Sequence, residues 1–176
     1  MINNKTKNLI VWGLRIILTI AFFVTMGWIF SNSLKDATQS GMQSSQVTED
    51  VKQVIETVKP DISFGGSTEE EDFNILHNYI RDFGHFAEFA LLCALCVWCL
   101  RSWTDKKVFL FLPIPLSIIV AIIDEYLQTF SEGRAQELSD IFTDTSGACA
   151  GFAFAVCTLL ILGMLYRFFK EKKQKS

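Results

Sequence analysis

The chain has 176 residues, of which 50% are apolar and 20% are charged, and it contains only 3 prolines. This length suits one compact unit or a small multi-span membrane protein and excludes two large domains. The apolar content excludes a disordered or fibrous chain, and the apolar residues fall into four long blocks separated by charged stretches. The formal net charge of -3 averages over an uneven distribution. We therefore expect an integral membrane protein rather than an acidic soluble one.

The first apolar block covers residues 9–30. As a helix with a rise of about 1.5 Å per residue, it is long enough to cross a hydrocarbon core roughly 30 Å thick. Lys5 and Lys7 precede the block, which makes a cleaved signal peptide the alternative. We favour an uncleaved anchor, because the block is long for a signal peptide and no A-x-A-like site follows it. Arg15 lies little more than one turn inside this span, so we expect its side chain to reach the lipid head groups.

Residues 32–80 form a long segment that we expect on the outer face of the membrane. Apolar residues recur in it at helical spacing and predict an amphipathic helix: Val47, Val51, Val54, Ile55 and Val58. After a break at residues 60–66, Ser67 and Glu70 have the spacing of a capping box and predict a second helix. We expect both helices to pack on the membrane surface or on the bundle. A lid over a substrate site is the alternative.

Three further blocks, residues 83–100, 108–130 and 146–169, are each long enough to cross the membrane once. Pro113 and Pro115 lie near the start of the third span, where a missing backbone donor costs least. The sequence thus predicts an all-α fold, an integral membrane four-helix bundle with short extracytoplasmic amphipathic helices. We assign residues 1–176 to a single membrane domain.

The basic residues predict the orientation of the spans. If the spans alternate, one side of the membrane receives most of the positive charge, which is carried by Lys5, Lys7, Arg101, Lys106, Lys107, Arg167, Lys170, Lys172, Lys173 and Lys175. The positive-inside rule assigns that side to the cytoplasm. We therefore expect a multi-pass protein of the cell membrane with both termini in the cytoplasm.

Several polar or ionisable side chains lie within or beside the last three spans, where each is costly unless it faces a protein interior or a water-filled cavity. They are Arg81, His85 and Glu88 on the second span, Asp124, Glu125 and Gln128 on the third, and Arg134, Asp140 and Asp144 at the approach to the fourth. The spacing places the three residues of the second span on one helix face, and it places Asp140 and Asp144 together on one face of the fourth. Because the predicted topology puts all three groups near the outer face, we expect them to line one outward-facing polar pocket.

Each of these residues also has a purely structural explanation. His85 could be a core histidine with its hydrogen bonds satisfied, Glu88 could pair with Arg81, and Asp140 could cap a helix. We prefer the pocket, because separate explanations would require the same burial cost at one depth on several spans.

Two other patterns in the spans are interpreted as structural. Gly147 and Gly151 form a G-x-x-x-G pattern, which provides a smooth helix face for close packing. Cys93, Cys96 and Cys99 resemble a metal motif at first, but they lie in an apolar span without a neighbouring His or acid. Cysteine in that setting behaves as a small hydrophobic residue.

The ordered combination of these motifs resembles the VanZ-like family, which is named for a teicoplanin-resistance protein. The resemblance rests on Arg81, His85, Phe86, Glu88 and Phe89, then Asp124, Glu125, Gln128, Phe130 and Arg134, then Asp140, Asp144, Gly147 and Gly151. The serine-containing stretch after the first span, with Ser33, Ser40 and Ser44, is a looser match. Two of the departures are Arg81, where lysine is common, and Asp144, where many members have asparagine. The resemblance implies a bacterial cell-envelope membrane protein linked to reduced susceptibility to lipoglycopeptide antibiotics.

Our first hypothesis is a binding protein whose pocket takes a lipid-linked cell-wall precursor or a lipoglycopeptide. In this hypothesis Arg81 and Arg134 contact phosphate or carboxylate, the remaining pocket residues orient them or bind sugar and amide groups, and no residue is assigned to a metal. Membrane lipid is the expected surrounding partner. The sequence does not identify a cofactor or an oligomeric state.

The alternative hypothesis is an intramembrane hydrolase or transferase acting on a lipid head group. His85, Glu88 and some of the four acids Asp124, Glu125, Asp140 and Asp144 would then hold a divalent metal or share acid and base work. Ion-coupled transport ranks third, because four short spans without a visible inverted repeat are few for a transporter. Nucleic-acid binding has no support, since the basic residues cluster at the membrane edges.

Overall fold

The computed structural model describes residues 3–59, 62–134 and 136–175. It is 86% helical and has no strand in that part of the chain. The elements are α1 (Asn4–Ser33), α2 (Ala37–Val58), α3 (Glu69–Trp103), the short 3-10 helix η1 (Lys107–Phe111), α4 (Pro113–Gln128) and α5 (Leu138–Lys175). The predicted all-α fold is confirmed. The break predicted at residues 60–66 falls partly on residues 60 and 61, which lie outside the described residues.

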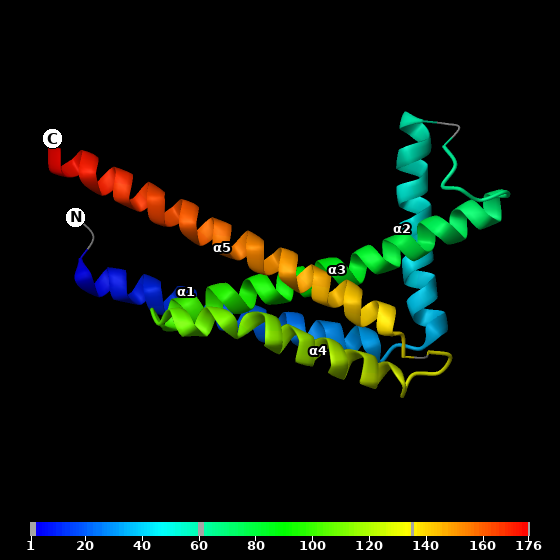
Figure 1. Cartoon of the computed structure of the whole chain (residues 1–176), viewed down its shortest axis with the longest axis horizontal. Helices are drawn as coiled ribbons and strands as arrows, with labels where there is room; N and C mark the ends of the chain where they lie inside the picture. The colour runs from blue at the N-terminus through cyan, green and yellow to red at the C-terminus, as the bar shows by residue number, and fades with distance from the viewer. Residues whose placement is uncertain (1–2, 60–61, 135, 176) are drawn as a thin grey trace.

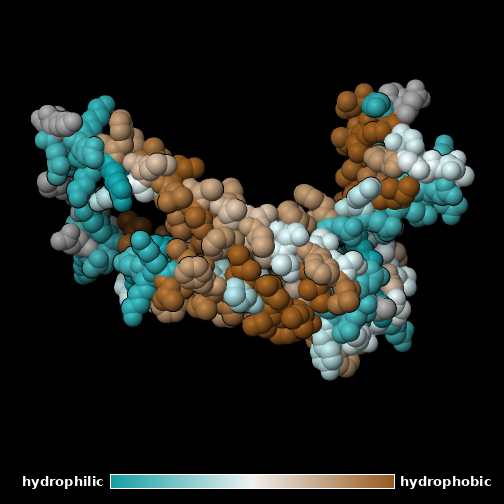
Figure 2. Space-filling view, viewed as in Figure 1, coloured by the Kyte–Doolittle hydropathy of each residue, from teal (hydrophilic) through white to brown (hydrophobic). Residues whose placement is uncertain are grey.

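Four of these segments, α1, α3, η1 with α4, and α5, are long and apolar enough to cross a membrane. Figure 1 shows them running along one axis, with both ends of the chain at the same end of the bundle. In Figure 2 hydrophilic residues cover the two ends of the molecule, while apolar residues predominate between them. The chain is thus built as a multi-pass membrane protein, because such an apolar belt is stable only in lipid.

The third span begins as the two prolines predict. Pro113 is the first residue of α4, where a helix has no intrahelical partner for the backbone N–H. The 16 residues of α4 extend only about 24 Å, at a rise of about 1.5 Å per residue. The short helix η1 precedes α4 and adds to its length, so the two together cross the membrane.

The second helix expected after residue 67 is not a separate element. The Thr68 side chain accepts a hydrogen bond from the Glu71 backbone N–H (3.2 Å), and the Glu71 carboxylate accepts one from the Ser67 N–H (2.7 Å). The cap is therefore one residue later than the predicted Ser67 and Glu70 pair. From this cap α3 continues without a break through Trp103, so the expected short helix forms the first turns of the second span.

In Figure 1 α2 lies across the axis of the bundle, and the first turns of α3 extend past it. The helix contains the predicted repeat of apolar residues, and its N-cap Asp36 accepts a hydrogen bond from the Gln39 N–H (2.7 Å). Near its middle, Ser44 and Thr48 lie 3.4 Å from the two ring nitrogens of His77 on α3. These contacts tie α2 to the part of α3 that precedes the membrane core.

Arg15 of α1 contacts the last turn of α3. Its Nε donates a hydrogen bond to the Ser102 carbonyl (2.8 Å), one of the last carbonyls of α3 that lack an intrahelical partner. The guanidinium also lies over the rings of Trp12 and Trp103, at 5.3 and 5.4 Å from their centroids. Arg15 thus joins α1 to the C-terminal end of α3, because a partly buried guanidinium is more stable when its charge and donors are satisfied by protein.

The closest approach of two helices in the bundle is between α3 and α5, which run parallel. A Cβ atom added at Gly147 would overlap the Phe86 carbonyl, and one added at Gly151 would overlap the Ala90 carbonyl. The predicted G-x-x-x-G pattern is therefore a real contact surface, on which the backbone of α3 lies directly.

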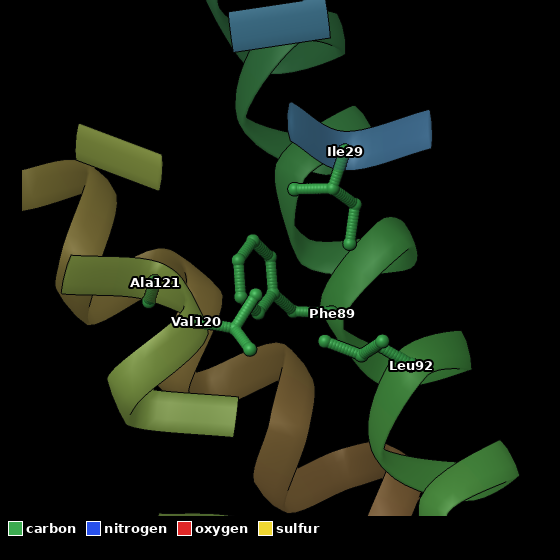
Figure 3. Packing of buried hydrophobic residues seen from close by; sticks show 5 residues of the cluster. All are labelled: Ile29, Phe89, Leu92, Val120 and Ala121. Atoms are coloured by element: carbon green, nitrogen blue, oxygen red, sulfur yellow. The ribbon is translucent and has the colours of Figure 1, made fainter. Parts of the chain in front are cut away.

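A small apolar core lies between the helices, near the end of the bundle opposite the two chain ends (Figure 1). Figure 3 shows Phe89 and Leu92 of α3 packed between Ile29 of α1 and the pair Val120 and Ala121 of α4. Phe89, Leu92 and Ala121 have no exposed surface. Because Phe89 follows Glu88 directly, and Val120 lies one helical turn before Asp124, this core forms the floor beneath the polar residues.

We predict that Gly151→Leu destabilises the protein by roughly 1–3 kcal/mol or more, because the new side chain would have to displace the backbone of α3. Gly163→Leu on the same helix is the matched control, since a Cβ there meets no atom within 4 Å. The measurement is the unfolding free energy of each variant in detergent micelles. Equal stability of the two variants would contradict the close packing.

Candidate functional site

The polar side chains predicted from the sequence meet at the end of the bundle opposite the two chain ends (Figure 1). The last turn of α1, the first turns of α2, the middle of α3, the last turns of α4, the first turns of α5 and the connection before α5 all contribute to this region. We call it the polar pocket and define it by the nine predicted residues together with Asn32, Ser33, Lys35, Ser40, Ser44 and Glu137.

Two adjoining cavities open in the polar pocket. The larger, of about 330 Å³, is lined by five of the predicted residues, Arg81, His85, Glu88, Asp124 and Arg134. The smaller, of about 210 Å³, is lined by Gln128 and shares Arg81 and Arg134 with the first. Glu125, Asp140 and Asp144 lie behind the cavity walls and are buried. The structure therefore brings all nine predicted residues together, five of them on the wall of one cavity.

Two contacts join α3 to α5 in this region. Arg81 donates a hydrogen bond to Asp140 (2.7 Å), and its side chain is 36% exposed whereas that of Asp140 is 7% exposed. One turn further along both helices, His85 Nδ1 lies 3.4 Å from an oxygen of Asp144, which has no exposed surface. The two contact residues on α3 are four positions apart, and so are their two partners on α5. The parallel helices therefore keep the same register over this turn.

The acids of α4 are held by donors from three segments. Ser33 of α1 donates a short hydrogen bond to Asp124, and Gln128 Nε2 donates to Glu125 (2.8 Å) and more weakly to Asp124 (3.3 Å). The second oxygen of Glu125 accepts the Glu137 backbone N–H (2.9 Å). Gln128 and Glu125 are therefore positioning groups, whose hydrogen bonds fix the last turn of α4 against the chain that leads into α5.

Glu88 does not pair with Arg81, the structural explanation weighed for it from the sequence. Its carboxylate accepts hydrogen bonds from Trp28 Nε1 (3.2 Å) and Asn32 Nδ2 (2.9 Å), both on α1. The i,i+7 spacing does place Arg81 and Glu88 on one face of α3, but Asp140 occupies the guanidinium, and α1 supplies neutral donors to the carboxylate.

Arg134 has a different environment from Arg81. Its guanidinium donates to Ser40 Oγ (2.8 Å) and reaches the carbonyls of Asn32 and Ser33 at 3.5 Å. Among the described residues, no carboxylate lies within 4.0 Å of it. Burial lowers the pKa of this guanidinium, and the nearby charge of Arg81 lowers it further, but a guanidinium remains protonated at any physiological pH. The polar pocket therefore contains a cation that no described carboxylate contacts directly, although the charges of Asp124, Glu125 and Asp140 are near enough to attract it.

Several pocket residues were not assigned a site role from the sequence. Only the loose family resemblance pointed to Ser33, Ser40 and Ser44, and nothing in the sequence singled out Lys35. Lys35 donates to Asn32 (2.9 Å) and Gln43 (3.0 Å) at the pocket rim. The one signal that could have identified this group is position, because these residues follow the first span at the depth of the other polar groups.

Four buried polar atoms of the polar pocket have no hydrogen-bond partner among the described residues. They are Arg81 Nε, His85 Nδ1 and both carboxylate oxygens of Asp144. The 3.4 Å separation of His85 and Asp144 is short enough for attraction between charges, but the geometry is not that of a hydrogen bond. Buried polar atoms usually have a hydrogen-bond partner, so these four atoms are the ones available to bond a group that enters the pocket.

The fold and the polar pocket together define the class of the protein, a multi-pass helical membrane protein with a hydrophilic site at one end of its bundle. The sequence profile of the VanZ/LLP1 family matches residues 16–162, which is most of the chain and includes every predicted site residue. The chain therefore belongs to the VanZ/LLP1 family. Neither a curated protein nor a solved structure matches it.

We predict that the pair of Arg81 and Asp140 contributes a coupling energy of roughly 1 kcal/mol or more, because Asp140 is nearly inaccessible to water. The measurement is a double-mutant cycle of Arg81→Gln and Asp140→Asn, followed by unfolding in detergent. The control cycle uses Arg101 and Asp105, a pair at the other end of α3 in which Asp105 is 95% exposed. Exposed pairs couple weakly, so equal coupling in the two cycles would contradict the burial of the site.

Proposed function

We propose that the polar pocket binds the anionic head group of a lipid-linked cell-envelope component. Membership of the VanZ/LLP1 family supports a role in susceptibility to teicoplanin-type lipoglycopeptides. In this proposal, occupation of the pocket alters the access of the antibiotic to its lipid-linked target.

The observation that carries the proposal is the Arg134 guanidinium, which is half-buried and has no carboxylate within 4.0 Å among the described residues. A partly desolvated guanidinium without a counter-ion binds phosphate strongly, because its planar N–H groups match two phosphate oxygens. Lys35, whose partners are the neutral oxygens of Asn32 and Gln43, provides a second positive charge at the rim of the same cavity.

The rest of the cavity lining suits a head group that is joined to an apolar chain. The hydroxyls of Ser40 and Ser44 and the carboxylate of Glu88 line its wall and can bond sugar hydroxyls. Val47, Ile80 and Phe83 line it as well, and Phe83 is 69% exposed on the outside of α3. A lipid could therefore place its phosphate on Arg134 while its chain leaves the pocket past Phe83.

The proposal requires that the polar pocket face away from the cytoplasm. Most of the basic residues lie at the opposite end of the bundle, where both chain ends and the connection between α3 and η1 are found (Figure 1). The positive-inside rule assigns that end to the cytoplasm, which supports a pocket in the outer half of the membrane.

Orientation can be tested with single cysteines and a membrane-impermeant thiol reagent on intact cells. Thr57→Cys at the end of α2 is expected to be labelled, whereas Lys172→Cys near the end of α5 should react only after the cells are opened. The native cysteines all lie in α3 and α5 within the apolar belt, where the reagent does not reach them. Labelling of Lys172→Cys but not of Thr57→Cys in intact cells would reverse the topology.

Head-group binding can be tested with the full chain in nanodiscs that contain undecaprenyl phosphate. We expect Arg134→Ala to weaken binding by at least about tenfold, because hydrogen bonds to charged groups contribute roughly 1.5–3 kcal/mol. Arg134→Lys, which keeps the charge without the planar fork, should lie between Arg134→Ala and wild type. Arg101→Ala at the other end of α3 is the matched control and should bind like wild type.

The same variants are then compared for teicoplanin susceptibility in a host that expresses them, after their stability in detergent has been checked. We expect Arg134→Ala to lose the effect on susceptibility and Arg101→Ala to keep it. Full binding and a full effect in Arg134→Ala would contradict the proposal. Binding of teicoplanin but not of undecaprenyl phosphate to the wild-type pocket would replace the lipid ligand with the drug.

A further inference from the structure

Three side chains from three different helices point at one place in the polar pocket. One potential ligand atom from each of His85 (α3), Asp124 (α4) and Asp144 (α5) lies within 4.8 Å of the other two. Glu88, which the metal-dependent hypothesis from the sequence also included, is held by α1 instead and takes no part in this cluster. The helix crossing at Gly147 and Gly151 fixes the separation of His85 and Asp144.

The electrostatic balance of this cluster is unfavourable without a cation. Asp124 and Asp144 are 1% and 0% exposed, and no Lys or Arg of the described chain lies within 4.0 Å of either carboxylate. Protonation of His85 would compensate one of the two negative charges and leave the other. Two neighbouring carboxylates in a membrane interior are costly, so a compensating charge is expected beside them.

The hydrogen bonds of the cluster also point to a missing group. Both oxygens of Asp144 and Nδ1 of His85 are buried without a hydrogen-bond partner among the described residues. Asp124, by contrast, is oriented by the donors Ser33 and Gln128. Side chains that hold a ligating carboxylate in place in this way are the usual surroundings of a metal ion.

We propose that His85, Asp124 and Asp144 hold a divalent cation. Ligand atoms at about 2.0–2.2 Å from an ion lie up to about 4.4 Å apart, so small side-chain movements would close the observed cluster around one. Two carboxylates balance the charge of such an ion. One imidazole nitrogen with carboxylate oxygens favours Zn²⁺ or Mn²⁺ over Ca²⁺ and Mg²⁺, whose sites are built from oxygen alone.

The ion would lie at the wall of the larger cavity, which His85 and Asp124 line together with Arg134. Three protein ligands leave at least one coordination position for water or for an oxygen of a bound phosphate. This last point rests on the proposed function, in which a head-group phosphate occupies the cavity. Binding of the ion itself is independent of it.

The test is titration of the metal-free full chain in detergent with Zn²⁺ or Mn²⁺ alone, without lipid, followed by elemental analysis after desalting. We expect one ion per chain in the wild type, and at least tenfold weaker binding in Asp144→Asn and in His85→Gln. Asp82→Asn, which removes an exposed acid from the same region of α3, is the matched control and should bind like wild type.

Thermal unfolding of the same samples separates loss of the site from loss of the fold. Zn²⁺ or Mn²⁺ should raise the Tm of the wild type and of Asp82→Asn in a saturable way. Asp144→Asn should have a metal-free Tm equal to or above that of the wild type, because it removes one of two neighbouring buried negative charges, and its Tm should not respond to the metal. No stoichiometric ion and no metal-dependent Tm in the wild type would overturn the inference. The proposed function is tested separately, by the effect of Arg134→Ala on undecaprenyl phosphate binding.

Discussion

The parallel crossing of α3 and α5 is the constraint on which the rest of this structure depends. Gly147 and Gly151 let the backbones meet, and the absence of side chains at these positions holds one register. That register sets Arg81 against Asp140 and His85 against Asp144. In lipid, where apolar packing provides little driving force between helices, such a close contact and the polar pairs beside it provide the specificity of association.

The polar groups of the pocket divide into two kinds. Glu88, Glu125 and Asp140 accept hydrogen bonds from α1, from the connection before α5 and from Arg81, respectively. No described Lys, Arg, Asp or Glu of opposite charge lies within 4.0 Å of Arg134, Asp124 or Asp144. The groups of the first kind stabilise the bundle. The groups of the second kind are those to which we assign the proposed binding of an anion and a cation side by side.

Much of this arrangement could be predicted from the sequence, because span length and the depth of charged residues are local properties. The four apolar blocks gave the helices, and the i,i+4 spacing placed Arg81 with His85 and Asp140 with Asp144 on common faces. The pairing of one face with the other could not be predicted, since it depends on the helix crossing. For the same reason the donors to Glu88 from α1 were missed. The helix expected after residue 67 continues into α3 instead of ending before the span. This was missed because polar residues in the sequence do not by themselves interrupt backbone hydrogen bonding.

The most direct test of the convergence of these helices is cysteine cross-linking in native membranes, with the linked peptides identified by mass spectrometry. The account predicts that His85→Cys with Asp144→Cys joins α3 to α5, and that Ser33→Cys with Asp124→Cys joins α1 to α4. Asp82→Cys with Asp144→Cys should remain unlinked, because Asp82 is exposed whereas Asp144 is buried. Cross-links in the control pair alone, or in none of the pairs, would contradict a common site at this end of the bundle.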